Sequence, residues 1–360
     1  MSRAVAFVLP SLAGGGAERV TLTLAGGLDR ARFAPQLIVF DRSGPLTDSV
    51  PQDIAVTDLQ RPRLRHARPA LIAALRQLRP DIVVSTFGYV NLALLAARRR
   101  LPRGTRLVLR EANLPSLSLP QARFGWLMAL GYRRWYRHAD RVIATSQRMA
   151  DEFAERYAVP RAGLAILPNP VDEAGLREAA AKPARMPGPG LRFITAGRFV
   201  AQKGFDRLID MFSELPNDAR LTILGDGPDR AALARQADAL GLGDRLALPG
   251  FTPAPWPHYA GADAFLMPSR WEGMPNAALE ALACGTPVIV TPEAGGVAEL
   301  AAAAPSDAVT IAPAGPNFLA AMRAVEPAPP AAPRPSLLPA SHRIENAVAA
   351  FEAILDGVAG

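Results

Sequence analysis

Short apolar runs alternate with segments of helical periodicity along most of this sequence, and this alternation constrains the fold more than any other feature. Apolar runs at residues 5–9, 82–86 and 107–110 are separated by segments with the helical repeat. Strands that alternate with helices usually pair in parallel, because a helix is the common connection between parallel neighbours. The sequence therefore predicts an α/β fold built on parallel sheets.

The alternation stops near residue 168 and restarts near residue 192, with a stretch rich in Pro, Gly and Ala in between. A chain of 360 residues also exceeds the size at which one hydrophobic core usually stops growing. We therefore expect two Rossmann-like domains, an N-terminal one on the acceptor side over residues 1–170 and a C-terminal one over residues 191–336. Residues 171–190 are predicted to be the linker.

A second segment rich in Pro and Ala, residues 327–339, precedes an amphipathic stretch at 341–355. Its apolar residues recur at helical spacing on one stripe, which needs a partner surface to be buried. We therefore predict a C-terminal helix within residues 337–360 that packs against one of the domains, including the N-terminal one.

The charge is distributed unevenly. Residues 1–170 hold 25 arginines, no lysine and 12 acidic residues, a formal charge of +13, which leaves −6 for the rest of the chain. A basic half indicates an anionic partner surface or substrate. No nucleic-acid-binding signature accompanies the basic residues, so we expect no nucleic acid partner. The single cysteine, Cys284, fits a reducing, cytoplasmic location.

Ligands of open parallel sheets bind beyond the carboxyl ends of the strands, so the loops there are the candidate sites. The loop after the first strand contains Gly14, Gly15 and Gly16 before a helix, which suits an anion, although a plain tight turn is the alternative. The loop after the first strand of the second domain contains Arg198 and Lys203. These two cations could hold a diphosphate, and Lys203 is one of only two lysines in the chain.

A third loop runs from Pro268 to the helix that contains Glu280, with Glu272 in the loop itself. Carboxylates accept hydrogen bonds from hydroxyls, so one could hold a ribose and the other a hexose. A fourth loop, residues 291–299, is rich in glycine and has a turn as its alternative reading. No Asp-x-Asp motif occurs and the four histidines lack metal-ligand spacing, so we expect no metal ion and no cofactor.

Together these segments resemble the family 4 retaining glycosyltransferases, which have the GT-B architecture of two facing Rossmann-like domains. The most specific match is the Glu-x7-Glu spacing of Glu272 and Glu280, within a typical setting from Pro268 to Val288. The resemblance implies that Arg198 and Lys203 hold the diphosphate of a nucleotide-sugar donor and that Glu280 holds its ribose. It also implies that the transferred sugar is bound by Glu272 and the residues Gly273, Met274, Pro275 and Asn276.

The resemblance further implies that the Gly14 to Gly16 loop approaches the diphosphate from the facing domain, and that Glu272, Arg198 and Lys203 are the catalytic group. Many family members have a histidine just after the strand that corresponds here to residues 107–110. This chain has Glu111 and Asn113 in that region, so they are acceptor-side candidates, with a simple strand-end turn as the alternative.

The expected function is transfer of a hexose from a UDP- or GDP-linked donor to a lipid-linked or polysaccharide acceptor, in cell-envelope or exopolysaccharide assembly. Alternatives are a nucleotide-sugar epimerase, a sugar phosphorylase, or an inactive nucleotide-sugar-binding protein. Residues 121–138 mix aromatic and aliphatic side chains with four arginines, a composition that suits peripheral contact with an anionic membrane at its inner face. Packing of this segment against its own domain is the alternative.

Overall fold

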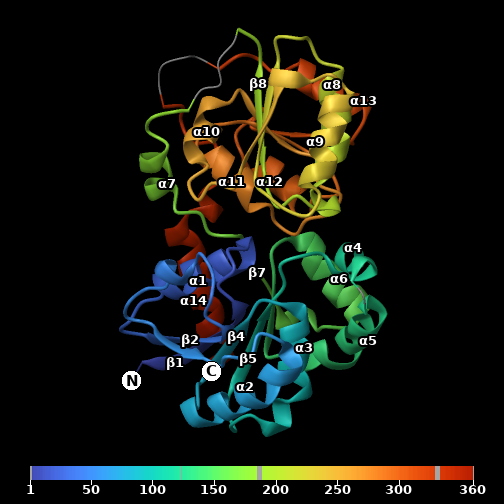
Figure 1. The fold of residues 1–360 in the computed structure, drawn as a ribbon. Helices are drawn as coiled ribbons and strands as arrows, with labels where there is room; N and C mark the ends of the chain where they lie inside the picture. The colour runs from blue at the N-terminus through green and yellow to red at the C-terminus, as the bar shows by residue number, and fades with distance from the viewer. Residues whose placement is uncertain (1, 123, 185–188, 329–332, 360) are drawn as a thin grey trace. The chain divides into compact units, whose positions relative to one another are not determined.

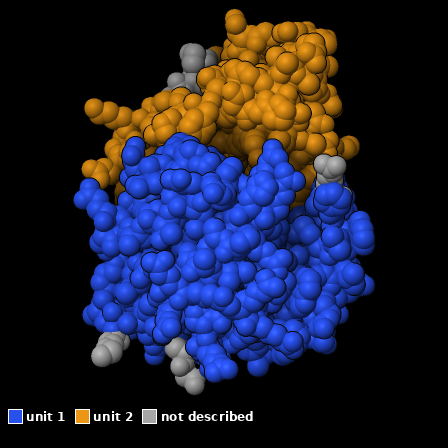
Figure 2. All heavy atoms as spheres, turned by 60° about the horizontal axis from the view of Figure 1, so that its bottom comes forward, with its two compact units in different colours: residues 1–170, 344–360 blue, residues 171–343 orange. Residues whose placement is uncertain are grey.

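The computed structural model describes residues 2–122, 124–184, 189–328 and 333–359 of the chain. They form two compact units: unit 1 comprises Met1–Pro170 with Ile344–Gly360, and unit 2 comprises Val171–Arg343 (Figure 2). Each unit contains one parallel sheet with helices around it (Figure 1). The predicted fold class, two Rossmann-like α/β units, is confirmed.

The sheet of unit 1 has seven parallel strands in the order β3-β2-β1-β4-β5-β6-β7. Its central strands are buried because helices cover both faces. Alternate side chains of β1 point to opposite faces, so Val8 joins the cluster under α2, α3 and α6 while Phe7 joins the cluster under α1. The strands are β1 (Arg3–Ser11), β2 (Phe33–Asp41), β3 (Ala55–Asp58), β4 (Ile82–Ser85), β5 (Arg106–Arg110), β6 (Arg141–Ala144) and β7 (Leu164–Ile166). The helices are α1 (Gly16–Gly27), α2 (Leu64–Leu78), α3 (Gly88–Ala96), α4 (Pro115–Ser118), α5 (Gly125–Trp135) and α6 (Gln147–Tyr157).

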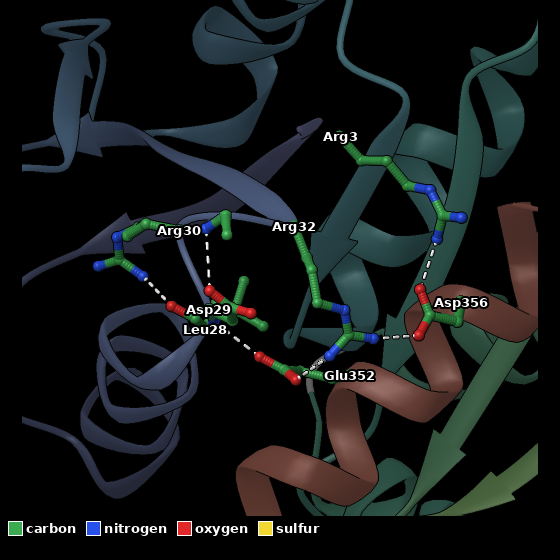
Figure 3. A network of polar contacts seen from close by, with 8 residues as sticks. Arg3, Leu28, Asp29, Arg30, Arg32, Glu352 and Asp356 are labelled. Carbon is green, nitrogen blue, oxygen red and sulfur yellow. Dashed lines mark hydrogen bonds and ion pairs between the residues drawn. The ribbon is translucent and has the colours of Figure 1, made fainter. Parts of the chain in front are cut away.

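The last helix, α14 (Ile344–Ala359), belongs to unit 1 although it follows unit 2 in the sequence. Its Phe351 is fully buried, with its ring centroid 6.1 Å from that of Phe7. Ion pairs fix its outer side: Arg3 Nη1 lies 2.6 Å from Asp356 Oδ1, and Arg32 binds both Asp356 and Glu352 (Figure 3). The C-terminal helix thus packs on the N-terminal domain, one of the two surfaces expected for it.

The sheet of unit 2 has six parallel strands in the order β10-β9-β8-β11-β12-β13. The strands are β8 (Arg192–Ala196), β9 (Arg220–Leu224), β10 (Leu246–Gly250), β11 (Ala264–Met267), β12 (Val288–Val290) and β13 (Val309–Ile311). The helices are α7 (Glu173–Ala179), α8 (Phe205–Ser213), α9 (Arg230–Ala239), α10 (Trp256–Gly261), α11 (Asn276–Ala283), α12 (Val297–Ala303) and α13 (Pro316–Arg323). None of the helices in the described ranges combines the length and hydrophobicity that a membrane span requires.

Several elements differ from the expectations. The residues predicted as a linker, 171–190, include α7, which packs against α10 and α11 of unit 2; residues 185–188 of that stretch lie outside the described residues, as do residues 329–332 of the second connector. The glycine loop predicted at 291–299 ends early, because α12 begins at Val297.

Candidate active site

The strand order of unit 2 reverses at β8. The strands β9 and β10 lie on one side of it, and β11, β12 and β13 lie on the other. In doubly wound sheets, ligands bind beyond the carboxyl ends of the strands at such a reversal. The loops that leave the two neighbouring strands there are residues 197–204 after β8 and residues 268–275 after β11, and they contain most of the donor-binding residues predicted in unit 2.

Lys203 and Glu272, one from each of these loops, form an ion pair. Lys203 ends a short 3₁₀ turn (Ala201–Lys203), and its Nζ lies 2.6 Å from Glu272 Oε1. Ser269 Oγ donates to the same carboxylate oxygen at 2.9 Å. The side chains of Lys203 and Glu272 are 25% and 9% exposed, so the pair is largely shielded from water and the Coulomb attraction between its charges is stronger than in a surface ion pair.

Two glycines allow the β8 loop to approach its surroundings this closely. Gly204 has φ +66° and immediately precedes α8, and a Cβ at this position would overlap the carbonyl oxygen of Pro268. The aliphatic part of Lys203 crosses Gly197, where a Cβ would lie 3.1 Å from Lys203 Cε. Gly204 is therefore required for the close passage of this loop past Pro268, and Gly197 leaves room for the side chain of Lys203.

Arg270 and Asp206 connect the two loops a second time. The guanidinium of Arg270 donates to both carboxylate oxygens of Asp206, at 2.8 and 2.7 Å, and also to the carbonyl oxygen of Ala201. The hydrogen bonds from Arg270 lower the pKa of Asp206. In addition, Gln202 Nε2 donates to the carbonyl oxygen of Trp271. The positions of Lys203 and Glu272 are therefore set by contacts on both sides of the pair.

The loop after β12 supports Glu272 from its backbone side. Gly295 N donates to the carbonyl oxygen of Glu272 at 3.1 Å, and Glu272 forms an isolated parallel bridge with Ala294. Thr291 Oγ1 donates to the carbonyl oxygen of Ser269 at 2.6 Å. Three loops that follow three neighbouring strands thus converge on one residue, Glu272.

Glu280 lies inside α11, as predicted, and is half-buried. Its Oε2 accepts a hydrogen bond from Trp256 Nε1 of α10 at 3.2 Å. Cys284 lies one turn further along, and burial together with the charge of Glu280 raises the pKa of its thiol to about 12. Cys284 is therefore a neutral, buried side chain, and Trp256 holds the Glu280 carboxylate in place.

The other predicted donor-binding residues of unit 2 lie on the same loops. Arg198 is exposed on the loop after β8, whereas Gly273 and Met274 are buried. Pro275 immediately precedes α11, and Asn276 is its first residue. The structure thus brings these residues to one edge of the sheet, while their roles in donor binding stay predictions.

The predicted glycine loop of unit 1 connects β1 to α1. Gly14 has φ +91° and Gly15 immediately precedes α1, so the local geometry is that of a tight strand-to-helix turn. A Cβ on Gly15 would overlap the carboxylate of Glu18, which is 8% exposed. The negative charge of Glu18 therefore already faces the first turn of α1, and the predicted phosphate contact of Gly14, Gly15 and Gly16 stays a prediction.

Glu111 lies at the carboxyl end of β5 but is enclosed, with 5% of the residue exposed. Asn91 Nδ2 donates to it at 2.8 Å, Tyr132 Oη at 3.2 Å, and Tyr136 Oη donates to it as well. Burial raises the pKa of Glu111 to about 7 against the effect of these three donors.

Such enclosure does not suit the acceptor contact suggested for Glu111 from the sequence, because its carboxylate is occupied by side chains of unit 1. Asn113 is half-buried two residues further along, and its acceptor-side role stays a prediction.

A groove of about 600 Å³ on unit 1 lies at the opposite edge of the sheet. Its lining comes from the segments that precede β4 and β5, and it is strongly basic: Arg76, Arg79, Arg99, Arg100 and Arg103 with one acid, Asp81. Arginines close to the C-terminal ends of helices interact favourably with the helix dipole. This position accounts for Arg76 of α2 and for Arg79, which immediately follows the helix. The groove also lies at the edge where open α/β sheets do not usually bind ligands.

Several residues of the site were not singled out from the sequence: Ser269, Thr291, Asp206, Arg270 and Trp256. Ser269 and Arg270 lie in the third candidate loop, but the order of residues in that loop does not indicate which of the two contacts Glu272. Trp256 is separated from Glu280 by the whole of β11, and no sequence pattern signals their contact.

Comparison with known proteins identifies the chain at the family level. Residues 14–174 match the model of Glycosyltransferase Family 4, and residues 177–320 match the model of Glycosyl transferases group 1. An uncharacterized glycosyltransferase of Methanocaldococcus jannaschii is 27% identical over 235 residues, which cover 61% of this chain and 58% of that protein.

Two characterised relatives match over more of their length. A 2-deoxystreptamine N-acetyl-D-glucosaminyltransferase of Streptomyces fradiae is 32% identical over 303 residues, covering 77% of this chain and 70% of that one. The N-acetylgalactosamine-N,N'-diacetylbacillosaminyl-diphospho-undecaprenol 4-alpha-N-acetylgalactosaminyltransferase of Campylobacter jejuni is 26% identical over 310 residues, 81% of each chain.

A solved structure, that of the Anabaena protein HepE in complex with UDP-glucose, has the same fold. Its TM-score is 0.68 at 18% identity, over 99% of this chain and 98% of that one. The family models together span both units, and the Streptomyces relative matches across most of its length. The chain therefore belongs to glycosyltransferase family 4 and has the GT-B architecture.

Proposed function

We propose that this glycosyltransferase moves a hexose from a UDP- or GDP-linked donor to a hydroxyl of a lipid-linked or polysaccharide acceptor, with retention of the anomeric configuration. The process it would serve is cell-envelope or exopolysaccharide assembly. The observation that carries the proposal is the Lys203–Glu272 ion pair at the strand-order reversal of unit 2. The names of the relatives, which include transfer to a diphospho-undecaprenol-linked acceptor and a complex with UDP-glucose, support it.

Lys203 is suited to bind the donor diphosphate while it holds Glu272. An ammonium group has three N–H donors, and one of them reaches Glu272 Oε1 at 2.6 Å. The others are available for phosphate oxygens, and Arg198 on the same loop is exposed. Both cations would stabilise the negative charge that develops on the leaving diphosphate, the term that dominates catalysis of this kind.

The two glutamates would bind the two sugars of the donor. Glu272, fixed by Lys203 and Ser269, would accept hydrogen bonds from the transferred hexose, assisted by the backbone of residues 273–276. Glu280, held by Trp256, would accept hydrogen bonds from the ribose. In this scheme the departing phosphate takes the proton of the acceptor hydroxyl on the face that it leaves, which gives retention.

We further propose that transfer needs no metal ion. The sequence lacks the Asp-x-Asp motif that supports metal-bridged diphosphate binding, and Arg198 and Lys203 supply positive charge instead. Chelator-treated enzyme is expected to keep its turnover, and loss of activity that is restored by Mg²⁺ or Mn²⁺ would contradict this part.

The first experiment is a thermal-shift screen with UDP, GDP, ADP and their sugars, because a ligand that binds the folded state raises the melting temperature. Product analysis with a labelled donor then separates transfer from epimerisation, and the anomeric proton coupling of the product reports retention or inversion.

Variants of the two cations test the site itself. Lys203→Ala and Arg198→Ala are each expected to lower turnover by about 100-fold or more. Lys182, the only other lysine of the chain, and Arg235 are both exposed, so Lys182→Ala and Arg235→Ala are the matched controls. Near-normal rates in both site variants would refute the assignment.

A lipid-linked acceptor places the reaction at a membrane. We therefore propose that the enzyme is cytoplasmic and makes peripheral contact with the inner face of the plasma membrane, which carries anionic lipids.

A further inference from the structure

Helix α5 of unit 1 exposes an unusual concentration of large apolar side chains. Trp126 is 72% exposed, Leu127 52% and Leu130 58%, and Phe124, just before the helix, is 56% exposed. The next large apolar side chain with comparable exposure, Phe251 at 65%, lies in unit 2. A contiguous patch of this kind on a soluble domain usually marks an interaction surface.

The opposite side of α5 is tightly seated on unit 1, so the helix cannot turn to bury these residues. A Cβ at Gly131 would lie 2.9 Å from Leu92 Cδ2 of α3, which shows how closely the two helices approach. Tyr132 is 2% exposed and its hydroxyl donates to Glu111 at 3.2 Å. The exposed side chains are therefore the outer face of a helix whose inner face is already packed.

The outer face continues into a basic strip. Arg133 and Arg134 of α5 and Arg137 of the 3₁₀ turn that follows (Tyr136–His138) are exposed. No acidic residue occurs between Glu111 and Asp140. Apolar residues next to cations without intervening acids are the composition of helices that lie at the surface of anionic bilayers.

We propose that the α5 face, formed by Trp126, Leu127, Leu130, Arg133, Arg134 and Arg137, docks on an anionic lipid bilayer. The apolar residues would enter the interface while the guanidinium groups bind lipid phosphates. This inference rests on the proposed function, because a lipid-linked acceptor requires the enzyme at a membrane. A second copy of the chain fits less well, since a symmetric contact would bring six arginines of this face into one interface without an acidic residue from either copy of the face.

The test measures binding of the full chain to vesicles of phosphatidylcholine with or without phosphatidylglycerol, by flotation at low salt. We expect binding to the anionic vesicles that weakens as the salt concentration rises, because screening reduces attraction of exposed charges. Trp126 serves as a probe: its emission should shift to the blue on binding, and lipids brominated on their acyl chains should quench it. Trp126→Phe should abolish that signal.

Two sets of variants separate the apolar and the basic parts. The Ser variant carries Trp126→Ser, Leu127→Ser and Leu130→Ser together. We expect it to bind anionic vesicles at least about 100-fold more weakly than the wild type. The matched control changes three exposed apolar residues of unit 2, Leu240, Phe251 and Ile311, to Ser and should bind as the wild type does.

Replacing Arg133, Arg134 and Arg137 by Gln should weaken binding by about fivefold per arginine. The control removes the same net charge elsewhere on unit 1, by Arg63→Gln, Arg65→Gln and Arg99→Gln, all at exposed positions. A large loss in this control as well would show that total charge, not the α5 face, governs binding and would overturn the proposal.

The proposal also fails if the wild type ignores anionic vesicles at low salt, or if the Ser variant floats as the wild type does. Sedimentation velocity without lipid tests whether a second copy of the chain binds the α5 face instead. If the wild type is a dimer that does not bind vesicles, and the Ser variant is a monomer, the face serves self-association and the proposal is overturned. Nucleotide binding by thermal shift is measured on the same proteins. Vesicle binding without any nucleotide binding would overturn the proposed function and leave the docking surface standing.

Discussion

Lys203 Nζ lies 2.6 Å from Glu272 Oε1, although 68 residues separate the two in the chain and each belongs to the loop after a different strand. The strand order makes this contact possible, because β8 and β11 are neighbours at the reversal of the sheet. The pair is therefore at once a structural link between two loops and the chemical centre of the proposed donor site.

The two roles of the pair can be separated. Lys203→Ala removes the cation from a carboxylate that is 9% exposed, so we expect the free energy of unfolding of unit 2 to fall by about 1 to 3 kcal/mol. Adding Glu272→Gln to this variant removes the buried charge and should restore most of that stability without restoring turnover. Urea unfolding and a transfer assay on both variants, with Lys182→Ala as control, check this; recovery of turnover in the double variant would contradict it.

Trp256→Phe tests the indole that holds Glu280. The variant keeps an aromatic ring but loses the N–H donor that lies 3.2 Å from Glu280 Oε2. We expect weaker nucleotide binding by about 5- to 10-fold, the size of one ordinary net hydrogen bond. Because the effect acts through the ribose contact, affinity for a 2′,3′-dideoxynucleotide should hardly change. Calorimetric titration with both ligands decides, and equal losses for both would show a merely structural role for Trp256.

Glu111 makes the stability of unit 1 depend on pH. Burial raises its pKa from 4.5 to about 7 in the folded protein, with Arg110 beside it and the hydroxyls of Tyr132 and Tyr136 on it. Between these values the folded state keeps a proton that the unfolded state releases. The contribution of this group to stability is therefore full below pH 4.5 and falls by up to about 1.4 kcal/mol per pH unit as the pH rises toward 7.

Glu111→Gln removes this titration. Relative to the wild type, the variant should gain stability from pH 5 to pH 7 and then keep a constant difference above pH 7. Urea unfolding across that range gives the comparison, and Glu155→Gln, whose side chain is 70% exposed, is the control that should follow the wild type. A difference between Glu111→Gln and the wild type that does not vary with pH would disprove the assignment.

Gly204→Ala tests the contact between the β8 and β11 loops. Gly204 has φ +66°, and an added Cβ would overlap the carbonyl oxygen of Pro268. Gly241 has nearly the same φ, +64°, but no atom lies within 4 Å of its would-be Cβ. Gly241→Ala should therefore lose only the roughly 1 kcal/mol of left-handed backbone strain, and Gly204→Ala clearly more, together with turnover. Equal melting temperatures for the two variants would count against the close contact.

The sequence predicted strands well where both faces of the strand are buried. The apolar runs at residues 220–224 and 264–267 predict strands, and β9 and β11 have these bounds. Strand β3 was missed because it is an edge strand whose residues are exposed or half-exposed, so no apolar run marks it. Helix α12 was missed because the two residues before it, Gly295 and Gly296, indicate a loop.

The candidate site was predicted in part for a similar reason. Loop positions after strands follow from local pattern, so Lys203, Glu272 and Glu280 could be assigned to one edge of a sheet. Which strands are neighbours is decided by packing of the whole unit, and the direct Lys203–Glu272 contact depends on that order. The enclosure of Glu111 was not predicted, because it comes from Tyr132 of α5 and Tyr136 of the 3₁₀ turn that follows, which the strand-end pattern does not reveal.

The position of α14 has a consequence for how the protein is made. The apolar face of unit 1 that receives Phe351 and Leu355 is synthesised with the first 170 residues, but those two side chains leave the ribosome only after the whole of unit 2. Unit 2 is continuous in sequence and can complete its fold during translation. Unit 1 must hold an uncovered hydrophobic face until the last helix arrives, which makes this face the natural point for chaperone contact during synthesis.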